Sequence, residues 1–187
     1  MNLSVDTPAR PPDPDLRAVA IGLGSNLGPR FAQLREAARR LTEDTLVDAR
    51  FSRVYETVPA YGLRQPPYLN ACCVGWTRRD PGGLLATLKD LESEAGRDPR
   101  APRFASRPLD LDILLYADEV MSTPRLTIPH PALPERAFVL VPLAEIAGAW
   151  RHPALRRTIS ELAAAVDPVG IQVTHLRLRE AREAHEP

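Results

Sequence analysis

Short apolar runs alternate with helix-like apolar stripes along most of the chain. Runs of apolar and β-branched residues bounded by turn residues predict strands. The predicted strands cover residues 18–22, 49–58, 68–78, 109–116 and 171–178, with a short one at Val120. Apolar residues spaced three or four apart predict helices. The first helix begins at Pro29, and its apolar face consists of Phe31, Leu34, Ala38 and Leu41.

Three further helices follow from the same spacing and from end signals. One begins at Asp80 and Pro81 and ends near Gly96. The next covers residues 136–147 and is expected to kink at Pro142. The last begins near Thr158, where Thr158 and Glu161 match a capping box.

The order of these elements predicts the fold class. Strand, helix, two strands, helix and strand form the split βαβ pattern of a ferredoxin-like α+β sandwich with a mainly antiparallel sheet. Residues 1–17 hold four prolines among charged residues and are expected to be a disordered leader. Residues 18–166 would form a single domain, and residues 167–187 an extension with a possible strand and a frayed tail.

Composition narrows the class of protein. The 187 residues are 44% hydrophobic, enough for one domain with a core. The net charge is zero, which argues against a general nucleic-acid or membrane surface. Cys72 and Cys73 are adjacent in an apolar stretch and cannot form an ordinary disulfide with each other. We therefore expect a reduced, cytoplasmic protein.

The stretch from Leu109 to Leu115 places two acids inside an apparently buried strand. Asp110 and Asp112 are two residues apart, so they point to the same face, with Cβ atoms about 7 Å apart. Such a pair could hold one cation, or two sharing a ligand. The alternative without a metal site is an alternating edge strand whose acids lie in solvent. A basic loop just before the strand favours a magnesium and polyphosphate site; it contains Arg97, Arg100, Arg103 and Arg107.

Two other motifs carry weaker signals. The segment from Gly22 to Gly28 has the spacing G-x-G-x-x-x-G, which differs from the dinucleotide-binding G-x-G-x-x-G. A tight turn capped by Ser25 or Asn26 is the favoured interpretation. His130 lies between two prolines in a loop, where a phosphate contact is plausible. A zinc site is not expected, because the cysteines and histidines lack ligand spacing.

Four blocks of sequence resemble one family when taken together. They are Gly24-Ser-Asn-Leu-Gly28, Gln65-Pro-Pro-Tyr-Leu-Asn70, Arg107-Pro-Leu-Asp-Leu-Asp-Ile-Leu114, and Ile128-Pro-His-Pro131 with Arg136-Ala-Phe-Val-Leu140. Over residues 18–150 the chain resembles the 6-hydroxymethyl-7,8-dihydropterin pyrophosphokinases of folate biosynthesis. The resemblance implies transfer of pyrophosphate from ATP to the pterin hydroxymethyl group, with release of AMP. It also implies two magnesium ions. We expect a monomer, and the zero net charge gives no reason to expect a nucleic-acid or membrane partner.

The resemblance also assigns roles to residues. Asp110 and Asp112 would bind both magnesium ions, and Arg97 and Arg107 would act in catalysis on the transferring phosphates. ATP contacts would come from Lys89, Glu92, Arg97, Arg100, Phe104, Arg107, Ile113, Arg125, Thr127, His130 and Arg136. The pterin would stack between Tyr68 and Phe138 and contact Gly24, Thr57, Val58, Ala60 and Asn70. No residue is assigned as general base.

The chain departs from the family pattern at several positions. Phe104 and Ala105 stand where Trp-Gly is usual. In the pterin loop the glycine is shifted along the chain, with Tyr61 before Gly62, and Arg64 stands where an acid is common. Lys89 replaces a residue that is often neutral or apolar. Two other interpretations stay open: a nucleotide-binding ferredoxin-like module without turnover, and a Rossmann-like oxidoreductase built on the glycine segment.

Overall fold

The structure is a computed structural model, and it describes residues 13–59, 65–98, 100–102 and 105–179. Its main sheet has the strand order β5-β1-β4-β3-β8, and β2 also pairs with β4. All the pairings in this sheet are antiparallel. The strands are β1 (Arg17–Ser25), β2 (Val47–Phe51), β3 (Arg53–Thr57), β4 (Tyr68–Thr77), β5 (Asp110–Tyr116) and β8 (Ile171–Arg177). A separate hairpin pairs β6 (Met121–Ser122) with β7 (Thr127–Ile128).

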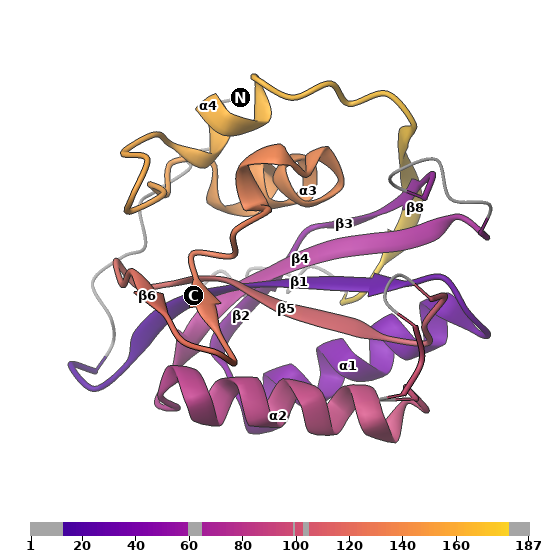
Figure 1. The fold of residues 1–187 in the computed structure, drawn as a ribbon, viewed down its shortest axis with the longest axis horizontal. Helices are drawn as coiled ribbons and strands as arrows, with labels where there is room; N and C mark the ends of the chain where they lie inside the picture. Colours follow the sequence, from indigo (N-terminus) through magenta and orange to yellow (C-terminus); the bar gives the residue numbers. More distant parts are fainter. Residues whose placement is uncertain (1–12, 60–64, 99, 103–104, 180–187) are drawn as a thin grey trace, which may run out of the picture.

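Helices cover both faces of the main sheet (Figure 1). One face carries α1 (Arg30–Asp44) and α2 (Pro81–Glu94), and the other carries α3 (Ala137–Ala147) and α4 (Ile159–Ala163). A short 3₁₀ turn, η2 (Leu133–Glu135), leads into α3. If β2 and β3 count as one interrupted strand, β1 to β5 follow the order β-α-β-β-α-β, so the predicted ferredoxin-like α+β class is confirmed.

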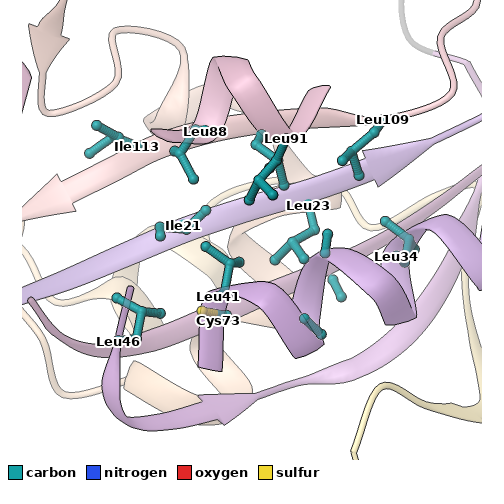
Figure 2. Close-up of a cluster of buried hydrophobic side chains, with 14 of the residues drawn as sticks. Ile21, Leu23, Leu34, Leu41, Leu46, Cys73, Leu88, Leu91, Leu109 and Ile113 are labelled. Carbon is teal, nitrogen blue, oxygen red and sulfur yellow. The ribbon is translucent and has the colours of Figure 1, made fainter. Parts of the chain in front are cut away.

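The two helical layers enclose two apolar cores. Between the sheet and α1 and α2, the core includes Leu34 and Leu41 of α1, Leu88 of α2 and Ile21 of β1 (Figure 2). A second core lies between the sheet and α3, and Leu140 of α3 is fully buried in it. The central strands pack against apolar layers on both sides, which holds the site residues of β1 and β5 on a rigid support.

The predicted second strand is interrupted at Ser52. The backbone N–H of Ser52 donates to the Cys72 carbonyl at 2.9 Å, and the Ser52 hydroxyl accepts from the Cys72 N–H at 2.9 Å. The side chain thus takes a place that a backbone carbonyl would hold, and β2 ends at Phe51 while β3 begins at Arg53. The prediction of one strand over residues 49–58 was wrong in this respect.

The predicted tight turn lies at the end of the glycine segment, and the first two glycines of the segment belong to a strand. Strand β1 continues through Gly24 to Ser25, and the chain turns at Gly28, which has a φ of 69°. Pro29 is the N-cap of α1, and among the described residues no side chain caps this helix, so Ser25 and Asn26 are not caps. Because Gly22 and Gly24 lie within an antiparallel sheet, the Rossmann-like interpretation has no structural basis here.

The starts of two other helices agree with the predictions from the sequence. Asp80 caps α2 by accepting from the Gly83 N–H at 2.6 Å, and Thr158 and Glu161 form the predicted capping box of α4. Helix α3 continues through Pro142. The short strand expected at Val120 begins one residue later, as β6.

The chain ends differ in how they relate to the predicted boundaries. Leu16 is buried and Arg17 opens β1, so ordered structure begins before the end of the predicted 1–17 leader; its first twelve residues lie outside the described ranges. Strand β8 pairs with β3 at the sheet edge, which makes the possible C-terminal strand part of the main sheet. No helix in the described residues is long and apolar enough to cross a membrane.

Candidate functional site

A cavity of about 290 Å³ lies on the α3 side of the sheet. It is bordered by β1, β4, β5, the His130 loop and the start of α3. The lining brings together many of the predicted site residues: Gly24, Thr57, Val58, Tyr68, Asn70, Arg97, Arg107, Asp110, Asp112, His130, Arg136 and Phe138. Residues that are far apart in the sequence therefore line the same cavity.

Gly22 and Gly24 of the central strand β1 form part of the cavity lining. Gly24 pairs with Asp110 of β5 on one side and with Asn70 of β4 on the other. A Cβ atom added at Gly24 would lie 3.0 Å from the Asn70 Oδ1 atom, which is tighter than ordinary contact. The glycine at this position therefore leaves space between an acid and an amide, rather than providing a turn.

Asp110 and Asp112 lie on one face of β5, as the spacing predicts. Within the described residues β5 pairs in the main sheet with β1 alone, so it is an edge strand, although its apolar side chains are buried. The side chains of Asp110 and Asp112 are 27% and 33% exposed and face the cavity. The strand is buried as predicted although it lies at the sheet edge, and the two acids face the cavity rather than bulk solvent.

Two arginines converge on the first acid. Arg97 and Arg107 each place a guanidinium nitrogen 2.9 Å from Oδ1 of Asp110. Burial alone would lower the pKa of Arg107, but the Asp110 carboxylate raises it above the ordinary value. Arg100 is different: its side chain is 90% exposed and lies beside Asp98. The structure thus brings Arg97 and Arg107 into the cavity lining and leaves Arg100 outside it.

Two further basic groups face the second acid. His130 Nε2 and an Arg136 guanidinium nitrogen are each 3.8 Å from Oδ2 of Asp112. His130 Nδ1 accepts a hydrogen bond from the Ala132 N–H, so a neutral ring carries its proton on Nε2. Burial lowers the pKa of His130, although Asp112 opposes that effect. The ring is therefore suited to donate a hydrogen bond from Nε2 into the cavity.

The other end of the cavity is aromatic and amide-lined. Tyr68 and Phe138 both line it, and the Arg136 guanidinium lies 5.7 Å from the centre of the Phe138 ring. Asn70 donates to the Thr57 hydroxyl at 2.7 Å, and both residues are buried. This bond fixes the Asn70 amide so that its Oδ1 faces the space above Gly24. Flat rings beside a fixed amide suit a planar polar heterocycle.

The remaining predicted nucleotide contacts lie away from the cavity lining. Ile113 has a buried side chain in the core beneath α1 and α2, and Thr127 pairs with Ser122 in the hairpin. Arg125 is exposed. Lys89 and Glu92 pair with each other on α2. Ala60 and Phe104 fall outside the described residues, as do Arg103 and the Tyr61, Gly62 and Arg64 departures.

Sequence reasoning missed the role of Asn26. This side chain is 1% exposed, and its Oδ1 accepts from the Arg107 N–H at 2.8 Å. Its Nδ2 donates to the Ser106 hydroxyl and to the side chain of Gln65. Asn26 therefore joins the end of β1 to the segments before β4 and β5. The signal was its place directly after an apolar strand, which was interpreted as a helix cap.

The carboxylate pair fits a magnesium ion. Mg²⁺ takes oxygen ligands and is commonly held by one or two protein carboxylates, with waters and substrate phosphates completing the shell. Asp110 and Asp112 supply that number, and both border open space. In the described ranges no cluster of three or more metal-binding side chains occurs.

Comparison with known proteins places the chain in a family. The model of the 7,8-dihydro-6-hydroxymethylpterin-pyrophosphokinase (HPPK) family matches residues 20–148. The 2-amino-4-hydroxy-6-hydroxymethyldihydropteridine pyrophosphokinase of Synechocystis sp. is 39% identical over 79% of this chain and 75% of its own length. The protein of that name from Aquifex aeolicus is 39% identical over 78% of this chain and 90% of its own length.

Longer proteins match as well. A folate synthesis bifunctional protein of Arabidopsis thaliana is 42% identical over 70% of this chain, which spans 27% of that relative's length. The crystal structure of Plasmodium falciparum HPPK-DHPS A437G with SDX-DHP aligns with a TM-score of 0.65 over 80% of this chain and 45% of that one. At 17% identity this likeness supports the fold alone. The family match covers most of the predicted domain, so the chain belongs to the 7,8-dihydro-6-hydroxymethylpterin-pyrophosphokinase family.

Proposed function

We propose that this protein transfers the pyrophosphoryl group of ATP to the hydroxymethyl group of 6-hydroxymethyl-7,8-dihydropterin and releases AMP. The observation that carries the proposal is the pair Asp110 and Asp112 on β5, flanked by four basic side chains and facing an aromatic pocket. The acids favour cations, the basic groups favour phosphates, and the rings favour a flat acceptor. Family membership supports the same reaction.

The acidic end of the cavity would hold the triphosphate with two magnesium ions on Asp110 and Asp112. When bound, such ions neutralise phosphate charge and orient the reacting oxygens. Arg97 and Arg107 would stabilise the charge on the transferring phosphates, which supplies much of the rate in this chemistry. His130 and Arg136 would hold the phosphates from the side of Asp112.

The rest of the nucleotide would lie along the outer edge of β5. Glu92 accepts from the Leu111 N–H and Lys89 approaches the Leu111 carbonyl, so the backbone groups of Leu111 point away from β1. Ile113 follows two residues later on the same strand, next to a register shift in its pairing with β1. Ile113 would contact the nucleotide through its backbone, with Thr127 and Arg125 of the neighbouring hairpin. Arg100 and Phe104 would contribute from the loop.

The aromatic end would hold the pterin between Tyr68 and Phe138. Asn70, held by Thr57, would form hydrogen bonds to the ring edge, and Gly24 would leave room for it. Val58 and Ala60 would supply loop contacts. We assign no general base, and we further propose a monomer in the cytoplasm, where the buried thiols of Cys72 and Cys73 would stay reduced.

Product analysis tests the reaction. The chain is incubated with ATP, Mg²⁺ and 6-hydroxymethyl-7,8-dihydropterin, and the nucleotides are separated by chromatography. AMP formed in step with pterin consumption supports the proposal. ADP would indicate an ordinary kinase instead, and nucleotide binding without any product would favour the alternative of a non-catalytic ATP-binding module.

Two variants and a matched control test the acids. Asp110→Ala and Asp112→Ala should each lower turnover by about 100-fold or more, because charge stabilisation at the phosphates is lost. Asp118→Ala removes an exposed acid just beyond β5 and should leave turnover unchanged. Near-normal turnover in either site variant would refute the metal assignment, and an unfolded variant would indicate a structural role for the acids.

A further inference from the structure

Glu92 on α2 is a buried carboxylate with a complete set of partners. Its side chain is 2% exposed. One oxygen, Oε1, accepts from the Leu111 N–H at 2.7 Å and from Lys89 at 2.9 Å. The other, Oε2, lies 3.0 Å from Lys89 and 2.5 Å from an Arg97 nitrogen. Little of its surface is left for a ligand, so these contacts point to a structural connection with the acid pair.

We propose that Glu92 is a positioning residue, which acts through Arg97 and Leu111 to keep Asp110 available to magnesium. The inference rests on the proposed function above and revises the nucleotide contact that the family resemblance assigns to Glu92. It concerns the described residues of α2, β5 and the loop that joins them.

Arg97 and a magnesium ion would compete for Asp110. The same Arg97 nitrogen lies 2.5 Å from Glu92 and 2.9 Å from Asp110, and Arg107 also binds that Asp110 oxygen. A magnesium ion on Asp110 must compete with these two positive groups. Because Glu92 is a second carboxylate for Arg97, the guanidinium can leave Asp110 without losing its ion pair. Without the Glu92 charge, Arg97 would depend on Asp110 alone.

Glu92 also contacts the strand between the two acids. Leu111 separates Asp110 from Asp112, and its outward N–H and carbonyl meet Glu92 and Lys89 in place of a neighbouring strand. An edge strand has no strand partner for its outer backbone groups, and a slip of one residue would turn both acids to the opposite face. The ion pair on α2 therefore holds β5 where both carboxylates face the cavity.

The variant Glu92→Gln distinguishes a positioning role of Glu92 from direct contact with the nucleotide. Glutamine keeps an oxygen that can accept from the Leu111 N–H, but it cannot balance the charge of Arg97. Glu94→Gln is the matched control on the same helix, since Glu94 is exposed and pairs with Arg40 away from the site. Mg²⁺ binding is measured by calorimetric titration into protein saturated with α,β-methylene-ATP, in which the bond to be cleaved is blocked.

We expect Glu92→Gln to raise the Kd for Mg²⁺ about tenfold, corresponding to about 1.4 kcal/mol. Glu94→Gln should change it less than twofold. If Glu92 acts through Arg97, the effect of Glu92→Gln should fall below twofold when Arg97→Ala is also present. Nucleotide affinity at saturating Mg²⁺ should stay within twofold in Glu92→Gln.

Several results would overturn the inference. These are an unchanged Mg²⁺ affinity in Glu92→Gln, an equal effect with and without Arg97, or a loss of nucleotide affinity at saturating Mg²⁺. If Glu92→Gln does not fold, as judged by circular dichroism, Arg97→Ala is tested in its place. Its binding of Mn²⁺ in the absence of nucleotide is measured by electron paramagnetic resonance. Removal of the competitor should leave Mn²⁺ binding at least as tight, and weaker binding would contradict the account.

Failure of the proposed reaction would look different. A wild-type chain that binds Mg²⁺ and the nucleotide but forms no AMP refutes the transfer reaction, while the titrations still test Glu92. A wild-type chain that binds no Mg²⁺ overturns the inference and the metal assignment together.

Discussion

Asn26 and Arg107 form a reciprocal pair between the end of β1 and the start of β5. The Arg107 N–H donates to Oδ1 of Asn26 at 2.8 Å, and the Asn26 N–H donates to the Arg107 carbonyl at 3.1 Å. Arg107 in turn binds Asp110 at 2.9 Å. A buried amide thus holds the backbone from which Arg107, one of the proposed phosphate-binding groups, extends.

Loss of the Asn26 side chain should weaken both the fold and the site. Asn26→Ala leaves the partly buried Arg107 N–H without its acceptor, which costs about 1–3 kcal/mol in free energy of unfolding. Urea denaturation measures that cost, and turnover should fall as well because Arg107 is less firmly held. Gln172→Ala, an exposed amide of β8, is the control. Equal stability of the two variants would contradict the role given to Asn26.

The sequence allowed much of the fold to be predicted because long periodic segments dominate it. The stripe of Leu34 and Leu41 and the alternation around Asp110 and Asp112 reflect burial directly, so their elements and faces agree with the structure. Interruptions caused by a single side chain were not visible. Ser52 breaks a strand by bonding to Cys72, a partner twenty residues away, and local pattern carries no such signal.

Parts of the site depended on contacts that spacing does not encode. Gly24 was interpreted as part of a turn capped by Ser25 or Asn26, whereas the need for glycine arises from Asn70 on the neighbouring strand. Glu92 gave no signal of its burial, because its three partners come from α2, β5 and the loop after α2. The family resemblance identified both residues as site residues but did not predict their contacts.

A methyl group at Gly24 should obstruct the cavity. In Gly24→Ala the new Cβ would lie 3.0 Å from Asn70 Oδ1 and 3.9 Å from the Asp110 Cβ. We expect pterin affinity to fall at least tenfold, about 1.4 kcal/mol, measured by calorimetry with the dihydropterin. Circular dichroism should still show a folded protein.

Gly82→Ala is the matched control for this variant. It adds the same methyl group at the start of α2, where the nearest atom would lie at 3.6 Å, in ordinary contact. Its pterin affinity should equal that of the wild type. If Gly24→Ala also binds the pterin normally, the ring does not occupy the space above Gly24.

His152 should make the fold sensitive to acid. The side chain is 5% exposed, and burial lowers its pKa below the ordinary value of 6.5. The unfolded chain then takes up the proton first as the pH falls, so the free energy of unfolding decreases as the pH drops through 6.5 toward the folded-state pKa. Above pH 7 the ring is neutral in both states and this loss is absent.

Chemical denaturation between pH 7.5 and pH 5 measures the effect. His152→Asn keeps an acceptor for the Leu155 N–H, which His152 Nδ1 accepts at 3.2 Å, but cannot take up a proton. The wild type should lose more stability than this variant over the range, with other groups contributing equally to both. Parallel pH profiles for the two proteins would show that His152 has no part in the acid sensitivity.

The central claim is that both outer phosphates of ATP move together to the pterin. ATP labelled with ³²P at the β phosphate tests it most directly, because an ordinary kinase transfers the γ phosphate alone. With Mg²⁺ and 6-hydroxymethyl-7,8-dihydropterin, the account predicts that the β label appears on the pterin product while unlabelled AMP is released. Label retained in ADP or released as free phosphate would contradict it.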